Sequence, residues 1–281
     1  MDLRVWTLSP AACLLALLLL APAARAEEVY NIGAEDDWYP FTAYRDGQVQ
    51  GLSVDIVRAA FAASDTRIEL LPYPYARCME LTRTGQLAGC FNTSPDARIV
   101  AEYRLPSEAL FSDDILLWAR AGAAPVESPE ALAGQRVAVT IGYEYGSRFD
   151  SDQRPVRVPV RRDLNGFLML ERGRVDYTVA FRGTAQALFQ QHAELQGRFV
   201  PVATVHQPQL YLSFSRHHPS AELLQQRFDE GMRRIRADDR YRRILERWHH
   251  DGAANRASDA TLWNTHSHNK KAEQTWPTPR N

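Results

Sequence analysis

The chain alternates short apolar runs with stretches that carry apolar residues at helical spacing. In its first third, the pattern predicts a strand at 29–32, a helix at 51–61, a strand at 68–71, a helix at 78–84 and a strand at 87–91. Strands and helices that alternate in this way are typical of a parallel sheet flanked by helices. We therefore expect an α/β unit in this part of the chain.

The same alternation returns later in the chain. It predicts strands at 137–141 and 175–180 and a helix at 164–172. Before this unit lies a strand-like run at 115–118, and after it the chain returns through an alternating run at 209–214. We expect two lobes, each a mostly parallel sheet flanked by helices, joined by two hinge crossings near residues 112 and 209.

The C-terminal part divides into a helical and a polar segment. Residues 221–249 predict two amphipathic helices that break near Asp238 and Asp239, and we expect them to cover the first lobe. From residue 253 the apolar periodicity stops. Residues 253–281 are therefore expected to form a disordered tail.

The first 26 residues are typical of a signal peptide. Arg4 precedes an apolar run at 11–22, and Ala24-Arg25-Ala26 matches the small-x-small pattern at which signal peptidases cut. The alternative is a membrane anchor, but the apolar run is shorter than the roughly 20 residues that span a bilayer. We expect cleavage after Ala26 and a periplasmic mature protein without a membrane span.

Composition and charge exclude several function classes. The 281 residues are 45% hydrophobic, which is enough for a real core, and 33 basic against 34 acidic residues leave a net charge of −1. Nucleic acid is therefore not an expected partner. The only lysines are Lys270 and Lys271, so the body of the chain has no lysine for a phosphate loop or a Schiff base.

Neither a metal nor a cofactor is expected. No zinc-helix motif, nucleophile elbow or dinucleotide glycine fingerprint occurs. The late histidines are expected to be solvated rather than to bind metal; they are His249, His250, His266 and His268.

Two cysteines, Cys78 and Cys90, follow the predicted signal peptide and lie 12 positions apart. In an oxidising compartment, an isolated pair at this spacing is expected to form a structural disulfide. The alternative is two buried thiols.

The order of several short segments resembles the periplasmic solute-binding proteins of the polar amino-acid uptake family, bacterial extracellular solute-binding protein family 3, over about residues 29–252. The segments are 37–41 after the first strand, Gly51 with Asp55, 81–89 and 93–98 around the third strand, 132–139 and 170–176 in the second unit, and 228–232 with Tyr241 and Trp248 near the end.

The resemblance implies a type II periplasmic binding fold. Lobe 1 would comprise residues 27–112 and 209–252, and lobe 2 residues 113–208. It also implies a monomer that closes around a small carboxylate-bearing solute, an amino acid or a similar compound, and delivers it to an ABC permease or a membrane receptor.

The resemblance assigns candidate ligand residues after the third strand. Arg98 stands where the family holds the ligand's α-carboxylate, and its guanidinium is suited to bidentate binding. Asn92, Thr93 and Ser94 are able to donate to the same oxygens. The alternative for Arg98 is an ordinary surface arginine.

Other candidates follow other predicted strands. Trp38 and Tyr39 lie on the first loop, where the family places an aromatic side chain on the ligand, although such a ring also serves as core or hinge cover. Tyr75 and Arg77 follow the second strand, with Arg77 either a second anion clamp or part of a salt bridge. From lobe 2, we expect the candidates that follow the strand at 137–141 to face the cleft, namely Tyr143 and Glu144, the latter either an ammonium acceptor or a solvated acid.

The sequence departs from the family after the strand at 175–180. There the amino-acid binders place an acid that receives the ligand's α-ammonium, whereas this chain has Phe181 followed by Arg182. An ammonium buried against phenylalanine would be unpaired and costly. Either another acid such as Glu144, Asp36 or Asp37 takes this role, or the ligand lacks the amine and Arg182 adds a positive contact.

Three functions remain open at this point. The first is the solute-binding protein. The second is an enzyme on the same fold with dehydratase-like acid–base chemistry on a carboxylated ring, and the third is a sensing or protein-contact role with a degenerate cleft.

Overall fold

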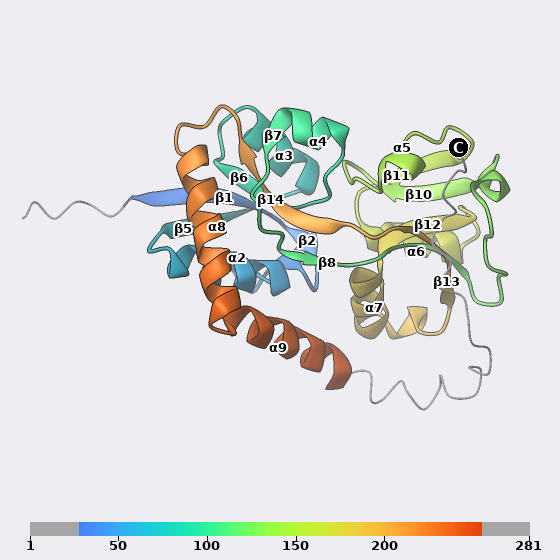
Figure 1. Ribbon diagram of the computed structural model, residues 1–281. Helices are drawn as coiled ribbons and strands as arrows, with labels where there is room; N and C mark the ends of the chain where they lie inside the picture. The colour runs from blue at the N-terminus through green and yellow to red at the C-terminus, as the bar shows by residue number, and fades with distance from the viewer. Residues whose placement is uncertain (1–27, 255–281) are drawn as a thin grey trace, which may run out of the picture.

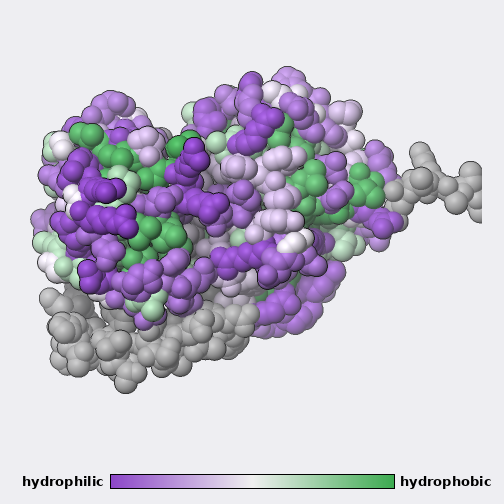
Figure 2. Space-filling view, turned by 180° about the vertical axis from the view of Figure 1, so that it is seen from behind, coloured by the Kyte–Doolittle hydropathy of each residue, from purple (hydrophilic) through white to green (hydrophobic). Residues whose placement is uncertain are grey.

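Two mixed β-sheets organise the chain into two lobes that lie side by side (Figure 1). The computed structural model describes residues 28–254. Seen from behind, a notch separates the lobes at the top of the molecule (Figure 2). The predicted signal peptide and nearly all of the predicted tail lie outside the described residues.

Lobe 1 is built on the sheet with strand order β5-β1-β6-β14-β7, to which β8 adds by pairing with β14. Its elements are β1 (Val29–Glu35), α2 (Leu52–Ala63), β5 (Arg67–Tyr73), α3 (Tyr75–Arg83), β6 (Gly89–Thr93), α4 (Ala97–Glu102), β7 (Tyr103–Arg104), β8 (Phe111–Ser112) and β14 (Gln209–Ser215).

Lobe 2 is built on the sheet with strand order β11-β10-β12-β9-β13. Its elements are β9 (Ile115–Arg120), the 3-10 helix η1 (Pro129–Leu132), β10 (Arg136–Thr140), α5 (Ser147–Asp150), β11 (Val156–Val160), α6 (Asp163–Glu171), β12 (Tyr177–Phe181), α7 (Arg182–Gln191), the 3-10 helix η2 (Ala193–Leu195) and β13 (Phe199–His206).

The two sheets share one topology. In lobe 1, β1 runs parallel to β5 and β6, and β14 lies antiparallel to β6. In lobe 2, β10 runs parallel to β11 and β12, and β9 lies antiparallel to β12. The antiparallel strand of each sheet is the first one after a crossing between the lobes. The predicted two-lobed α/β fold class is therefore confirmed.

Both crossings are short. One connects β8 to β9 through Asp113 and Asp114, and the other connects β13 to β14. The Asp114 carboxylate accepts hydrogen bonds from Arg182 at 2.7 Å and from Gln207 at 3.0 Å. These contacts tie the two crossings to the start of α7.

Two helices cover lobe 1 at the C-terminal end of the described chain. They are α8 (Ala221–Ala237) and α9 (Arg240–Ala254), and α8 packs across α2, with the Phe228 and Phe61 ring centroids 5.8 Å apart. The break falls at Asp238 and Asp239, where Asp239 has a φ of 62°. Of the apolar residues that the periodicity places on one face of α8, Leu224, Phe228, Met232 and Ile235 are buried, whereas Leu223 is exposed.

A small third sheet lies beside lobe 1 and was not predicted. It is made of β2 (Asp37–Trp38), β3 (Thr42–Arg45) and β4 (Gln48–Gln50). Asp46 and Gly47 join β3 to β4 with φ of 52° and 76°, the left-handed values of a two-residue hairpin turn. The sheet positions Trp38 next to the cleft.

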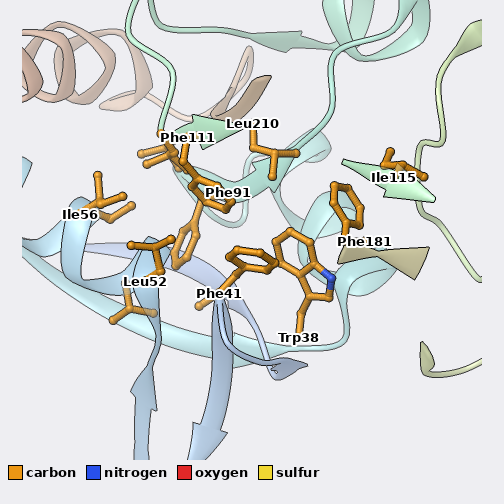
Figure 3. Close-up of a cluster of buried hydrophobic side chains, with 14 of the residues drawn as sticks. Trp38, Phe41, Leu52, Ile56, Phe91, Phe111, Ile115, Phe181 and Leu210 are labelled. Atoms are coloured by element: carbon orange, nitrogen blue, oxygen red, sulfur yellow. The ribbon is translucent and has the colours of Figure 1, made fainter. Parts of the chain in front are cut away.

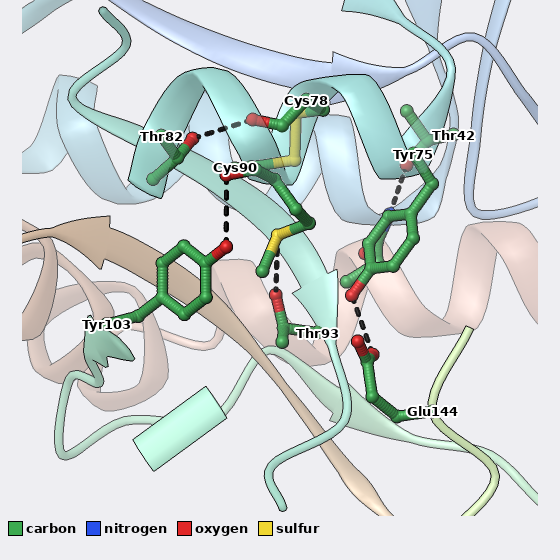
Figure 4. Close-up of a disulfide and its surroundings, with 10 residues drawn as sticks. Thr42, Tyr75, Cys78, Thr82, Cys90, Thr93, Tyr103 and Glu144 are labelled. Carbon is green, nitrogen blue, oxygen red and sulfur yellow. Dashed lines mark hydrogen bonds between the residues drawn. A yellow bond between two sulfur atoms is a disulfide. The ribbon is translucent and has the colours of Figure 1, made fainter. Parts of the chain in front are cut away.

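Cys78 and Cys90 form the predicted disulfide, which joins α3 to β6 (Figure 4). Both side chains are fully buried. Closing a loop of this size stabilises the fold by about 3 kcal/mol in the chain-entropy picture. The bond holds the beginning of β6 against α3, and both elements carry cleft residues. Among the described residues, no helix is long and apolar enough to cross a membrane.

Candidate functional site

A small cavity lies between the lobes and is lined by residues of both. Lobe 1 contributes Glu35, Trp38, Tyr75, Asn92 and Ser94, and lobe 2 contributes Tyr143, Glu144 and Phe181. The space left between these side chains is about 10 Å³, which is room for about one water molecule. The lobes are therefore closed on each other, and an amino acid fits only if they first move apart.

The cavity lies where the carboxyl ends of the parallel strands meet. Glu35 ends β1, Phe181 ends β12, and Tyr143 and Glu144 come shortly after β10. Ligands of open α/β sheets bind beyond these strand ends. Asn92, near the end of β6, has a φ of 76°, a left-handed conformation that asparagine tolerates better than most residues and that is frequent at functional sites.

Polar side chains pair across the cleft. Arg98 of α4 donates to Oε1 of Glu144 at 2.8 Å. The Tyr75 hydroxyl donates to Oε2 of the same carboxylate at 2.7 Å, as Figure 4 shows. The Tyr143 hydroxyl of lobe 2 donates to Glu35 of lobe 1. Each pair joins one lobe to the other, so these contacts hold the closed arrangement.

Aromatic rings form one wall of the cavity. The Trp38 ring meets Phe181 edge-on with centroids 4.9 Å apart, and Phe41 packs behind Trp38 at 4.5 Å (Figure 3). Tyr143 meets the Trp38 ring at 6.3 Å. This wall excludes water and strengthens the charge interactions beside it.

Three buried polar atoms in the cavity lining have no hydrogen-bond partner within the described chain. They are Nε1 of Trp38, Oδ1 of Asn92 and Oγ of Ser94. Buried polar groups are nearly always paired, and each unpaired one costs about 1–3 kcal/mol. One donor, one acceptor and one hydroxyl are therefore available to a polar ligand.

Buried carboxyl groups dominate the electrostatics of this region. Burial raises the pKa of Glu144 to about 7, against the lowering effect of Tyr75 and Arg98. Burial also raises the pKa of Glu35 well above its usual value. Asp163, which lies at the start of α6 and accepts a hydrogen bond from Thr140, has its pKa raised by burial to about 6.

We expect the free energy of unfolding to fall as the pH rises from about 5 to about 8. The native state keeps protons on Glu144 and Asp163 that the unfolded chain has already released, so their stabilising contribution is lost as the pH rises through the folded pKa values. One pKa unit corresponds to about 1.4 kcal/mol, so these groups together contribute a few kcal/mol. The lowered pKa of His206 acts in the opposite direction, with a smaller shift.

Urea unfolding at the two pH values measures this dependence. The Glu144→Gln variant has no titrating group at this position, so its free energy of unfolding should change less with pH than that of the wild type. Equal or greater stability at the higher pH would contradict the burial of ionisable carboxyl groups.

Five of the residues that the sequence singled out do not line the cavity. Arg98 is one of them and reaches the cavity only through its hydrogen bond to Glu144, and the others are Thr93, Tyr39, Arg77 and Arg182. Thr93 is buried beneath it, with Oγ1 against Sδ of Met79 at 3.7 Å. Tyr39 packs on Trp248 and under the Arg45 guanidinium, and Arg77 is exposed on α3. Arg182 pairs with Asp114 at the crossing instead of reaching into the cleft, because the first turn of α7 directs it there.

Sequence reasoning missed Glu35, the buried acid at the cavity. Its position gave a usable signal, since it is the last residue of the first strand and the carboxyl end of that strand meets the cleft. A charged residue that ends an apolar strand is a candidate for such a site.

The fold and the site define a class. Two α/β lobes joined by two short crossings, with a polar cavity between them, are the architecture of a two-lobed solute-binding protein that opens and closes about a hinge.

Comparison with known proteins identifies the family. Residues 30–251 match the family of bacterial extracellular solute-binding proteins, family 3, so the chain belongs to this family. It is 23% identical, over 83% of its length and 93% of the relative, to the putative amino-acid ABC transporter-binding protein PatH of Vibrio harveyi.

Solved structures share the fold at low sequence identity. A histidine kinase sensor domain with similarity to periplasmic binding proteins has a TM-score of 0.70 and 19% identity, covering 79% of this chain and 96% of its own. A mutant of ArgBP from T. maritima has a TM-score of 0.67 and 17% identity, covering 78% and 94%. These matches support the type II periplasmic binding fold.

Proposed function

We propose that this protein captures a small carboxylate-bearing solute, an amino acid or a similar compound, in the cleft between its lobes and presents it to a membrane partner. The observation that carries this proposal is an inter-lobe cavity with unpartnered polar atoms of Trp38, Asn92 and Ser94, where Arg98 holds the lining residue Glu144. Such a set of convergent polar groups in an aromatic-lined cavity is typical of a small-molecule site.

Arg98 is the proposed carboxylate clamp. Its guanidinium is half exposed and already holds one carboxylate oxygen, that of Glu144, at 2.8 Å. A solute carboxylate that entered an open cleft would find the same donors. Opening first separates Glu144 from Arg98, because the two residues belong to different lobes.

The proposed place of action is the periplasm. The signal-peptide pattern of the first 26 residues and the disulfide between Cys78 and Cys90 support it, because such bonds persist in oxidising compartments. The similarity to PatH supports delivery to an ABC permease. The similarity to a kinase sensor domain supports presentation to a membrane receptor as the second candidate.

Replacement of Arg98 tests the proposed function. We expect Arg98→Ala to weaken binding of a carboxylate solute by roughly 10- to 100-fold, since hydrogen bonds to charged groups contribute about 1.5–3 kcal/mol. Calorimetric titration of amino acids and small carboxylates measures the affinity. Heat that saturates at one equivalent, without turnover of the solute, also separates a binding protein from the dehydratase-like enzyme.

Arg83→Ala is the matched control. This arginine is comparably exposed and pairs with Glu80 on the outer face of α3, away from the cavity lining. Its removal should leave the affinity unchanged. An Arg98→Ala protein that binds every carboxylate as tightly as the wild type would overturn the proposed function.

A further inference from the structure

The ligand-facing end of β12 carries no acid. Phe181 ends this strand, is 4% exposed, and meets Trp38 edge-on at the cavity. A bound amino acid would bury its α-ammonium near this wall, where an unpaired charge is strongly unfavourable. A site that holds an amino acid therefore needs a carboxylate from somewhere else.

The cavity lining contains two acids, Glu35 and Glu144. Glu35 is buried, and burial raises the pKa of its carboxyl well above the usual value, which favours the neutral form. Among the described residues, its hydrogen-bond partner is the Tyr143 hydroxyl, and the charged groups that act on it are the acids Asp36, Asp37 and Asp163. A neutral carboxyl gives little compensation to an ammonium.

Glu144 differs because a positive charge faces it, and above its pKa of about 7 it is a carboxylate. Arg98 holds Oε1 at 2.8 Å, and Tyr75 holds Oε2 at 2.7 Å. Glu144 is 6% exposed and belongs to lobe 2, whereas Arg98 and Tyr75 belong to lobe 1. The cleft is thus closed by an ion pair with one charge on each lobe.

We propose that Glu144 holds the α-ammonium of the bound solute, so that an amino acid enters as a zwitterion between the two halves of the Arg98–Glu144 ion pair. This inference rests on the proposed function. The carboxylate and the ammonium of an α-amino acid are attached to the same carbon and therefore lie close together. A small opening between Arg98 and Glu144 is enough to admit both groups. The carboxylate then faces Arg98 on lobe 1, and the ammonium faces Glu144 on lobe 2.

Charge compensation favours the replacement of the direct Arg98–Glu144 contact by a bound zwitterion. Leaving one partner of an ion pair uncompensated inside a protein is unfavourable, and here the cost falls mainly on Glu144, because Arg98 is half exposed. A zwitterion replaces both partners at once, so Arg98 and Glu144 keep opposite charges beside them in the bound state. A solute with only one of the two charges leaves one of them uncompensated.

The same geometry couples ligand binding to closure of the two lobes. Since Arg98 and Glu144 lie on different lobes, a zwitterion between them connects the lobes in place of their direct contact. Glu144 is therefore the residue that selects α-amino acids over amines and carboxylic acids of the same side chain.

The test uses the mature chain and three matched series of probes in calorimetric titration. These are the L-α-amino acids, their amines without the α-carboxylate, and their acids without the α-ammonium. We expect at least one amino acid to bind, with both of its analogues roughly tenfold or more weaker. In Glu144→Gln, its affinity should fall by a similar factor, while that of the deaminated acid changes little.

Glu102→Gln is the control variant. Glu102 also approaches Arg98, at 3.7 Å, but lies partly exposed on α4 and does not line the cavity. This variant should bind like the wild type. Circular dichroism and thermal unfolding establish that the variants fold, and the analogue series on the wild-type chain tests the proposal without any substitution.

Several outcomes would overturn the inference and leave the proposed function intact. One is a Glu144→Gln protein that binds amino acids as well as the wild type or more tightly, which is the result expected if Glu144 only competes with the solute for Arg98. Another is a deaminated acid that binds as well as the amino acid. By contrast, the failure of every carboxylate to bind would overturn the proposed function itself.

Discussion

Gly183→Val should leave the chain folded and weaken solute binding roughly 10- to 100-fold. Gly183 lies in the first turn of α7 in lobe 2, and a Cβ atom there would lie 2.6 Å from Cζ of Phe41 in lobe 1. Phe41 has no room to retreat, because it stacks on Phe111 at 4.8 Å and packs on Trp38 at 4.5 Å. The valine would therefore act as a wedge between the closed lobes.

The size of the effect follows from the cost of overpacking. Extra carbon atoms in a packed contact cost about 1–3 kcal/mol, and each 1.4 kcal/mol taken from the closed state lowers the apparent affinity about tenfold. The contact joins two lobes, so we expect opening to remove it and the free energy of unfolding of either lobe to change little. Calorimetric titration reports the affinity, and small-angle scattering reports whether added solute still compacts the protein.

A second-site change provides the control. Phe41→Leu removes the ring atom that the valine would contact, so the double variant should recover part of the affinity that Gly183→Val loses. A Gly183→Val protein with wild-type affinity and normal compaction would show that this contact does not limit closure.

Gly231→Ala is expected to destabilise the protein by about 3 kcal/mol or more. Gly231 lies in α8 where this helix crosses α2, and a Cβ atom there would lie 1.8 Å from the carbonyl oxygen of Ala60. The obstacle is backbone, so one helix has to shift as a whole. This cost exceeds the gain of about 1 kcal/mol that alanine brings over glycine within a helix.

The midpoint of urea unfolding measures this loss. Gln226→Ala in the same helix is the control, because Gln226 is exposed and its replacement should change the midpoint little. Since Gly231 is in the helix layer of lobe 1 and not in the cavity, the folded fraction of Gly231→Ala should bind solute normally. Wild-type stability for this variant would contradict the close approach of α8 and α2.

Local patterns accounted for most of the elements. The apolar spacing of α2 and α8 and the apolar runs of β1, β6, β10 and β12 were read from the sequence because each is set by neighbours within a few positions. The small sheet of β2, β3 and β4 was overlooked although Asp46-Gly47 is a hairpin signal, because its strands have only two to four residues.

The candidate site was predicted only in part. The carboxyl-end rule correctly brought Trp38, Asn92, Glu144 and Phe181 to one cavity, because parallel strands end at the same edge of a sheet. It did not separate Tyr39, Arg77 and Arg182 from them. Side chains on the same loop or helix point in different directions, and only their packing partners decide which of them faces the cleft.

The sequence by itself determined the fold class and the disulfide, since the order of strands and helices and the number of cysteines allow few arrangements. Only the tertiary structure decided that Arg98 and Glu144, 46 positions apart, form an ion pair across the lobes, and that Glu35 is buried against Tyr143. These contacts depend on how two separately folded lobes close on each other. No periodicity within either lobe encodes that geometry.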